Sequence, residues 1–368
     1  MEEYHYNLKL ASRIANQLSI ISPRNSNYEN LKKIDVAKNI FKNYGNIGGL
    51  DHPIQKMIIT NFLDLRLSYY YVRFSKMPNV YYYFIENNSF KIMVKKYDND
   101  YFIGIFSGVF YIIQDLIFKV NSNTVDSKLS ITNFRNNISF DQKDESNLFK
   151  NNNALFHENI PLFQVIFQTI FTHELCHIIR GHLDLKENEK LSRSELQTLE
   201  MDADSFSVNY FFIFNIEHQI INKETSFLKL SKKNIETLEN YLFYTYIFLR
   251  FQNLNKFEIN KTPNLRHPPT IIRLKFIIDN ILSILELKVL EKEKLLHFAS
   301  NNIPQIIKKA EETYLKITYD SEKLINFIEL FDSKEFDEYK IKIFSNWNKL
   351  RDKLVNYSIS DLPEKNNF

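Results

Sequence analysis

Two histidines and a glutamate stand in a spacing that suits metal binding and the activation of water. The segment HELCH contains His173, Glu174 and His177. Residues four apart share one face of an α-helix, so both imidazoles can bind one zinc ion. Zinc with three protein ligands lowers the pKa of water in its open position, and Glu174 can accept the released proton. The spacing predicts hydrolysis of an amide, with Glu174 as general base and acid.

A third ligand is expected on the next helix. Ser192 and Glu195 have the spacing of a capping box, which predicts that a helix begins there. That helix presents Glu200 and Asp204 on one face, and Glu200 is the predicted third ligand. Asp204, one turn later, can accept the free ring N–H of a ligand histidine and fix its tautomer. Asp202 points about 200° around the helix from Glu200 and is expected to be a surface charge.

The first two ligands are expected on a long buried helix. Apolar residues recur at three- and four-residue spacing over residues 162–171, a pattern that runs straight into His173. Gly181 is typical of a helix C-cap, and His182 after it is expected beside the site or facing solvent. Cys176 is expected to fill space in the helix as a small apolar side chain.

Three motifs in this order resemble those of the gluzincin zinc metallopeptidases. HELCH matches HExxH, and the segment EMDAD from Glu200 to Asp204 matches ExxAD. Further along, HPPTIIR from His267 to Arg273 resembles the HPxxxxR element of the M48-like and phage-exclusion (Lit-type) peptidases. The resemblance covers roughly residues 80–273, and the C-terminal hundred residues lie outside it.

The resemblance implies roles for seven residues. It places zinc on His173, His177 and Glu200, with Glu174 as general base and acid. Asp204 would be the hydrogen-bond partner of a ligand histidine. His267 and Arg273 would border the site, and His267 could donate a hydrogen bond to the oxyanion of the tetrahedral intermediate.

The rest of the sequence predicts a mainly helical α+β protein: a zincin-like metallopeptidase core with a small sheet or hairpin packed on the active-site helix. Residues 80–85 (VYYYFI) and 90–95 (FKIMVK) are rich in β-formers and flank the turn-like ENNS, which predicts a β-hairpin. Residues 101–120 are strongly apolar but contain Gln114, Asp115 and Lys119, which favours a buried helix over a membrane span.

Three modules are expected along the chain. Residues 1–150 form an N-terminal α+β module with the hairpin and the buried aromatic helix, and residues 151–285 form the helical zinc metallopeptidase core. Residues 286–368 form a C-terminal helical extension. The polar stretch 121–153 reads as a loop between the first two modules.

Composition limits the partners and the setting. The 368 residues include 47 basic and 44 acidic side chains, a net charge of +3 that gives no strong field for nucleic acid. Cys176 is the single cysteine, which excludes an intramolecular disulfide, and the N-terminus lacks the order of a signal peptide. We expect a cytoplasmic protein that acts on a protein or peptide, with no nucleic-acid partner and no stable membrane span.

Two functions are consistent with these patterns. The first is a soluble zinc-dependent endopeptidase, which the resemblance makes a regulated protease of the phage-exclusion or defence type. The second is a catalytically silent zinc-binding protein that binds a partner through its C-terminal helices. The intact Glu174 favours the first. The substrate, the activating signal and the oligomeric state are left open.

Overall fold

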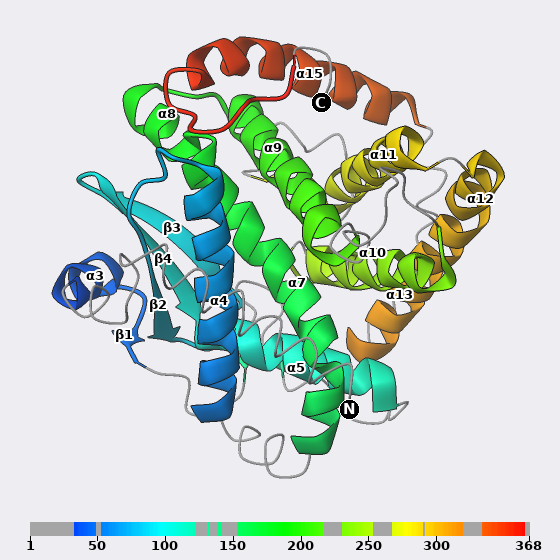
Figure 1. The fold of residues 1–368 in the computed structure, drawn as a ribbon, viewed down its shortest axis with the longest axis horizontal. Coiled ribbons are helices and arrows are strands. Elements are labelled where there is room, and N and C mark those ends of the chain that lie inside the picture. The colour runs from blue at the N-terminus through cyan, green and yellow to red at the C-terminus, as the bar shows by residue number, and fades with distance from the viewer. Residues whose placement is uncertain are drawn as a thin grey trace. The chain divides into compact units, whose positions relative to one another are not determined.

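A computed structural model describes residues 33–48, 53–122, 131–132, 139–140, 153–216, 230–252, 267–289, 291–318 and 333–364. Most of these residues are helical and a small mixed sheet accompanies them, so the predicted α+β, mainly helical class is confirmed (Figure 1). The chain forms two compact units, Met1–Val109 and Phe110–Phe368. This boundary differs from those expected near residues 150 and 285, and the three modules stay a prediction about which segments fold independently.

The first unit contains a four-stranded sheet in the order β1-β2-β4-β3. The central pair, β2 and β4, is parallel, whereas β1 on β2 and β3 on β4 are antiparallel. Along the chain the elements are α3 (Ile34–Phe41), β1 (Asn46–Ile47), α4 (Pro53–Arg73), β2 (Val80–Glu86), β3 (Ile92–Tyr97) and β4 (Asp100–Phe106).

The hairpin predicted between residues 80–85 and 90–95 is wrong, because β4 lies between those two strands. The tight hairpin joins β3 and β4 instead, with Tyr97 paired to Asp100 across a two-residue loop. Asp98 in this loop has φ 53°, a left-handed conformation that aspartate tolerates better than most residues. The pair Asp98–Asn99 was therefore the hairpin signal in the sequence.

The helix predicted over residues 101–120 is wrong at its start and right in its remainder. Residues 101–106 belong to β4, and the helix α5 runs over Ser107–Ser122. Aromatic and β-branched residues suit a central strand with partners on both edges. Gly104 permits the close packing of this strand: an added Cβ would lie 2.6 Å from Ile85 Cδ1 and 2.7 Å from a ring carbon of Phe41.

The second unit is built around helix α9, which contacts α7, α11 and α15 (Figure 1). Neighbours on several sides leave α9 with little exposed surface, and 14 of its 19 residues are buried. The main helices of this unit are α7 (Asn153–Ile179), α8 (His182–Asn188), α9 (Arg193–Phe211), α10 (Lys232–Gln252), α11 (Thr270–Lys288), α12 (Lys292–His297), α13 (Ile303–Thr318) and α15 (Lys334–Leu354).

Short elements complete the second unit. The π-helical turns η2 (Phe212–Ile216) and η5 (Phe298–Asn302) extend α9 and α12. Strands β5 (Ile131–Thr132) and β6 (Ser139–Phe140) pair antiparallel. They lie within the polar stretch 121–153, most of which is outside the described residues, so the predicted loop there stays a prediction.

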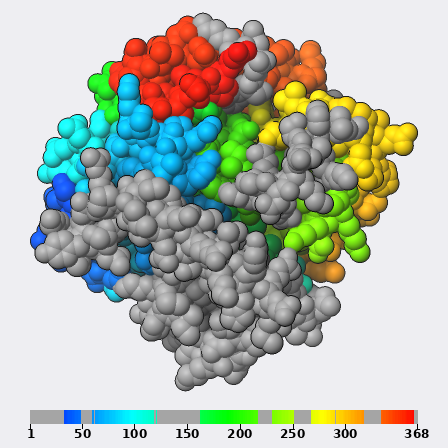
Figure 2. Space-filling view, in the orientation of Figure 1, coloured from blue at the N-terminus to red at the C-terminus, as the bar shows by residue number. Residues whose placement is uncertain are grey.

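Helix α15 packs its apolar face onto α8 and α9. Trp347, Leu350 and Leu354 are fully buried together with Leu185 of α8 and Leu199 of α9. The opposite face of α15, coloured red, lies at the surface in Figure 2 and carries exposed charged residues. The predicted C-terminal extension therefore contributes directly to the core around α9.

The segment after α15 is hydrogen-bonded to the end of α7. The backbone N–H of Ile359 donates to the Ile179 carbonyl at 3.0 Å, and Arg180 donates to the Asp361 carbonyl. The first of these bonds satisfies a carbonyl at the helix C-terminus, where carbonyls lack partners within the helix, and the second attaches the Arg180 side chain to the C-terminal segment.

Helix α7 is unusually apolar. Among the described residues, Leu162–Ile179 is the one helical stretch long and apolar enough to cross a membrane, and 67% of it is buried inside the protein. Burial in the core of the unit accounts for this composition without a bilayer.

Candidate metal site

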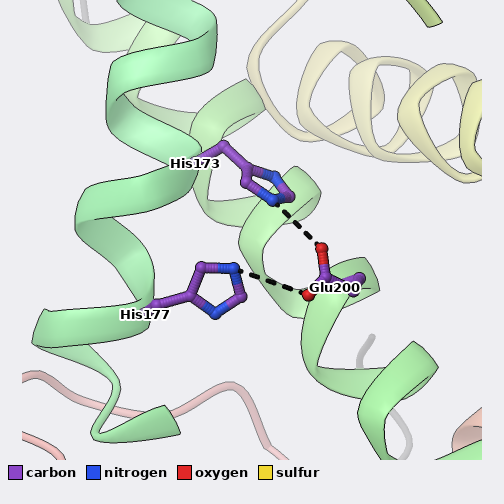
Figure 3. A group of neighbouring side chains, drawn as sticks. All are labelled: His173, His177 and Glu200. Atoms are coloured by element: carbon purple, nitrogen blue, oxygen red, sulfur yellow. Dashed lines mark ion pairs between the residues drawn. The ribbon is translucent and has the colours of Figure 1, made fainter. Parts of the chain in front are cut away.

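The structure brings the three predicted metal ligands together. His173 and His177 lie one turn apart on α7, and both imidazoles point toward Glu200 on α9 (Figure 3). His173 Nε2 lies 3.3 Å from Glu200 Oε2, and His177 Nε2 lies 3.7 Å from Glu200 Oε1. The three side chains are 7–11% exposed, so the site is recessed but not sealed.

These atoms fit a divalent metal ion such as zinc. Zinc bonds of about 2.0–2.2 Å to nitrogen and oxygen place tetrahedral ligand atoms roughly 3.3–3.6 Å apart, close to the separations found here. Two imidazoles and one carboxylate are a ligand set of zinc hydrolases, which leave the fourth position to water or substrate. Both Nδ1 atoms are occupied by other partners, as metal-ligating histidines require.

His173 is held by a buried carboxylate that is itself paired with an arginine. Its Nδ1 lies 2.9 Å from Asp204 Oδ1. From α11, Arg273 donates to both oxygens of Asp204, through Nε at 2.8 Å and a terminal nitrogen at 2.7 Å. Burial alone would raise the pKa of Asp204, but Arg273 and His173 hold it below its usual value. Asp204 is thus an ionised carboxylate where it contacts His173, and Arg273 stabilises that charge from the other side.

His177 is held differently, by a second histidine. Gly181 adopts a left-handed conformation with φ 72° between α7 and α8, and this turn brings His182 back beside α7. His182 Nδ1 lies 2.9 Å from His177 Nδ1, and its Nε2 lies 3.0 Å from Asp202 Oδ2. Gly181 is required here also because an added Cβ would lie 2.4 Å from Tyr357 Cβ.

The expectation that Asp202 is a surface charge is wrong. Its side chain is 1% exposed and contacts His182. Its side chain does point away from Glu200. On that side of α9, however, it meets α7 and α8 instead of solvent, because other helices pack around α9. The sequence signal for this contact was Gly181 directly before His182. A glycine at the end of a helix allows the chain to turn, so His182 does not continue the face spacing of α7.

Cys176 is fully buried, as expected for a small residue filling space in the helix. Burial raises the pKa of its thiol well above the usual value, with Asp202 adding to the effect. Its Sγ lies 3.9 Å from Asp202 Oδ2. Cys176, His182 and Asp202 thus form a second group whose potential ligand atoms lie within 4.8 Å of one another.

Three further side chains border the ligands. Glu174 is partly exposed and makes no hydrogen bond or ion pair within the described part of the chain, and burial raises its pKa to about 7. His267 Nδ1 lies 3.3 Å from Glu200 Oε2, and 48% of this side chain is exposed. Lys186 Nζ on α8 lies 4.0 Å from Glu200 Oε1. Lys186 was not predicted, because its proximity depends on the turn at Gly181.

In the metal-free protein, the two ligand histidines differ in protonation. Burial alone would lower the pKa of His173, but hydrogen bonds to Asp204 and Glu200 raise it to about 9. Burial lowers the pKa of His177 well below its usual value. Glu200 is buried too, yet the imidazoles around it hold its pKa well below the usual range. A metal ion would therefore replace a proton on His173 and face an ionised Glu200.

Comparison of the chain with models of known protein families, with curated proteins and with solved structures finds no match. The argument for a function therefore starts from the geometry of the metal site and from the motifs that supply it.

Proposed function

We propose that this protein is a zinc-dependent endopeptidase of the gluzincin type. The observation that carries the proposal is the convergence of His173, His177 and Glu200 with Glu174 beside them. Both ligand imidazoles present Nε2 toward Glu200, while both Nδ1 atoms are held by buried partners. This arrangement keeps both Nε2 atoms aimed at one point, which is what a preorganised metal site needs.

Zinc bound by His173, His177 and Glu200 would supply Lewis acidity, lowering the pKa of water and polarising the scissile carbonyl. Glu174 accepts the proton of the attacking water and then delivers it to the leaving amine. A pKa of about 7 in the metal-free protein suits both roles near neutral pH. Its lack of a hydrogen-bond partner within the described residues leaves the carboxylate available for this transfer.

His267 lies on the accessible side of the site, because its ring contacts Glu200 while almost half of the side chain is exposed. From there it donates a hydrogen bond to the oxyanion that develops on the substrate. Arg273 does not reach the substrate in this mechanism. It neutralises Asp204 and so holds His173 in place.

The substrate class follows from the chemistry and the resemblance together. Water activated beside a general acid suits an amide, and the gluzincin motifs point to peptide bonds of a protein. The resemblance to phage-exclusion peptidases extends the proposal to a regulated, defence-type protease in the cytoplasm. Peptide bonds are the substrate proposed, with no role for nucleic acid.

The test is zinc analysis of the purified full chain, joined to a proteome-wide search for cleaved peptides. Glu174→Gln should keep one zinc per chain and lose cleavage by about 100- to 10,000-fold, the usual contribution of a general acid–base. Glu187→Gln, an exposed carboxylate on α8, is the matched control and should retain both properties.

Two results would reject the proposal. A wild-type protein that stays metal-free after zinc addition would remove its basis. If Glu174→Gln instead keeps zinc and still performs the biological function, the protein is a catalytically silent zinc-binding partner protein that acts through its C-terminal helices.

A further inference from the structure

Three buried side chains form a chain of contacts that runs from the ligand His177 through His182 to the carboxylate of Asp202 on α9. His177 Nδ1 contacts His182 Nδ1 at 2.9 Å, and His182 Nε2 contacts Asp202 Oδ2 at 3.0 Å. Their side chains are at most 7% exposed, so water does not compete for these contacts. Arg180 Nε lies 3.8 Å from Asp202 Oδ2.

One arrangement of protons satisfies both contacts. A carboxylate only accepts hydrogen bonds, so Nε2 of His182 must carry a proton and donate it to Asp202. A neutral imidazole then has a bare Nδ1, which accepts a hydrogen bond from Nδ1–H of His177. His177 is left with a lone pair on Nε2, the atom that faces Glu200. The reverse polarity would set a bare nitrogen against the carboxylate at 3.0 Å.

The contact between His177 and Glu200 agrees with this assignment. Nε2 of His177 lies 3.7 Å from Glu200 Oε1, which is too long for a hydrogen bond. Glu200 therefore does not hold a proton on that nitrogen, and the two shorter contacts decide the tautomer.

We propose that His182 and Asp202 form a hydrogen-bond relay that fixes the tautomer of His177 for metal binding. Both are positioning residues, and their role rests on the proposed zinc site. The two ligand histidines then have parallel supports from α9: Asp204 holds His173 directly, and Asp202 holds His177 through His182. Each aspartate has an arginine neighbour, Arg273 for Asp204 and Arg180 for Asp202.

The relay also decides between two uses of Cys176, His182 and Asp202, which lie close enough to hold a metal themselves. A metal there would occupy Nε2 of His182 and leave its proton on Nδ1. That proton would be donated to His177 Nδ1 and would place the His177 proton on Nε2, where it blocks the first site. The two metal sites exclude one another, so the relay requires one metal per chain.

The first experiment compares zinc affinities of the full chain by competition with a chromophoric chelator. Asp202→Asn keeps the shape but can donate to His182 and reverse the relay, and it should weaken zinc binding about 10- to 100-fold, as for other partners of ligand histidines. His182→Gln preserves the polarity, because its amide oxygen accepts while its amide nitrogen donates, and should retain most of the affinity. Cys176→Ala leaves the relay intact and should retain one zinc with wild-type affinity.

The second experiment reads the tautomers directly, by nitrogen NMR of metal-free protein labelled with ¹⁵N-histidine. The relay requires a proton on Nδ1 of His177 and on Nε2 of His182 in the wild type, and loss of this pattern in Asp202→Asn. The signals of His177 and His182 are assigned with His177→Gln and His182→Gln, each of which removes one imidazole. This readout needs neither zinc nor cleavage, so it stays decisive even if the proposed peptidase function fails.

Three results would overturn the relay. They are a proton on Nε2 of His177 in the wild type, an Asp202→Asn variant with wild-type zinc affinity, and a second zinc that disappears in Cys176→Ala.

Discussion

Replacing Arg273 by methionine tests how the site supports His173. The change removes the cation from a pair in which Arg273 and Asp204 are 7% and 6% exposed and share two hydrogen bonds of 2.7–2.8 Å. Removing one partner of a buried pair leaves an uncompensated charge and costs about 3–5 kcal/mol. His173 stays as a neighbour of Asp204 and offsets part of that charge, so we expect a loss near the lower limit, about 3 kcal/mol.

The double variant Arg273→Met/Asp204→Asn separates charge from packing. Both charges are then absent, and we expect it to regain at least half of the stability that the single variant loses. The assay is urea unfolding of the metal-free protein followed by circular dichroism. Arg193→Met, the same substitution at an exposed position of α9, should change the free energy of unfolding by less than about 0.5 kcal/mol.

Zinc affinity gives a second readout of the same variants. Without Arg273, the charge of Asp204 is balanced by the imidazolium of His173, and that proton competes with the metal. Arg273→Met should therefore bind zinc more weakly than wild type. The reasoning is refuted if the single variant loses less than about 1 kcal/mol, or if the double variant is no more stable than the single.

Three further predictions follow from the site and its supports. Metal binding near neutral pH should release a proton from His173, because its pKa of about 9 lies above its unfolded value. Zinc affinity should therefore rise with pH and level off above about 9. Calorimetry in buffers of different ionisation enthalpy measures the number of protons released, and a result of no release would contradict the assignment. Gly181→Ala should lower the free energy of unfolding by at least about 1–2 kcal/mol, because alanine is strained in the left-handed conformation. It should also detach the segment around Tyr357, which limited proteolysis detects. Gly181→Asn relieves the backbone strain but not the clash with Tyr357, so equal proteolysis of both variants identifies the clash as the cause. Trp347→Ala should lower the free energy of unfolding in urea by about 3–5 kcal/mol, because the indole is fully buried against α8 and α9. Ile341→Ala, on the exposed face of α15, should leave this free energy nearly unchanged. Similar losses in the two variants would contradict the packing.

The cluster of candidate metal ligands could be predicted because their spacing is local. His173 and His177 share one face of their helix whatever the tertiary structure around it. The helix that carries ExxAD could be predicted from its capping box, which forms between Ser192 and Glu195 as expected. What the spacing could not show is which side of α9 meets solvent. Asp202 appeared exposed because periodicity alone assigns a polar residue to the surface, whereas contacts with α7, α11 and α15 leave α9 with little exposed surface.

The sheet shows the same limit in another form. The strands over 80–86 and 92–97 follow from their β-formers, but their pairing depends on a third strand, which was assigned to a helix because of its apolar composition. A run of six apolar residues is compatible with either structure until partners are known. The turn at Asp98 and the crowded Gly104 were the local features that distinguish the two.

The bond between Arg180 and the carbonyl of Asp361 spans 181 positions of the chain. During synthesis on the ribosome, a nascent chain that has emerged only as far as α11 already holds His173, His177, Glu200 and Arg273. The end of α7 is still unclamped at that stage, because α15 and the segment after it have yet to emerge. Contacts of such long sequence separation form late and at high entropic cost. The contacts that clamp the end of α7 can therefore form only after residue 361 has been made, long after the candidate ligands.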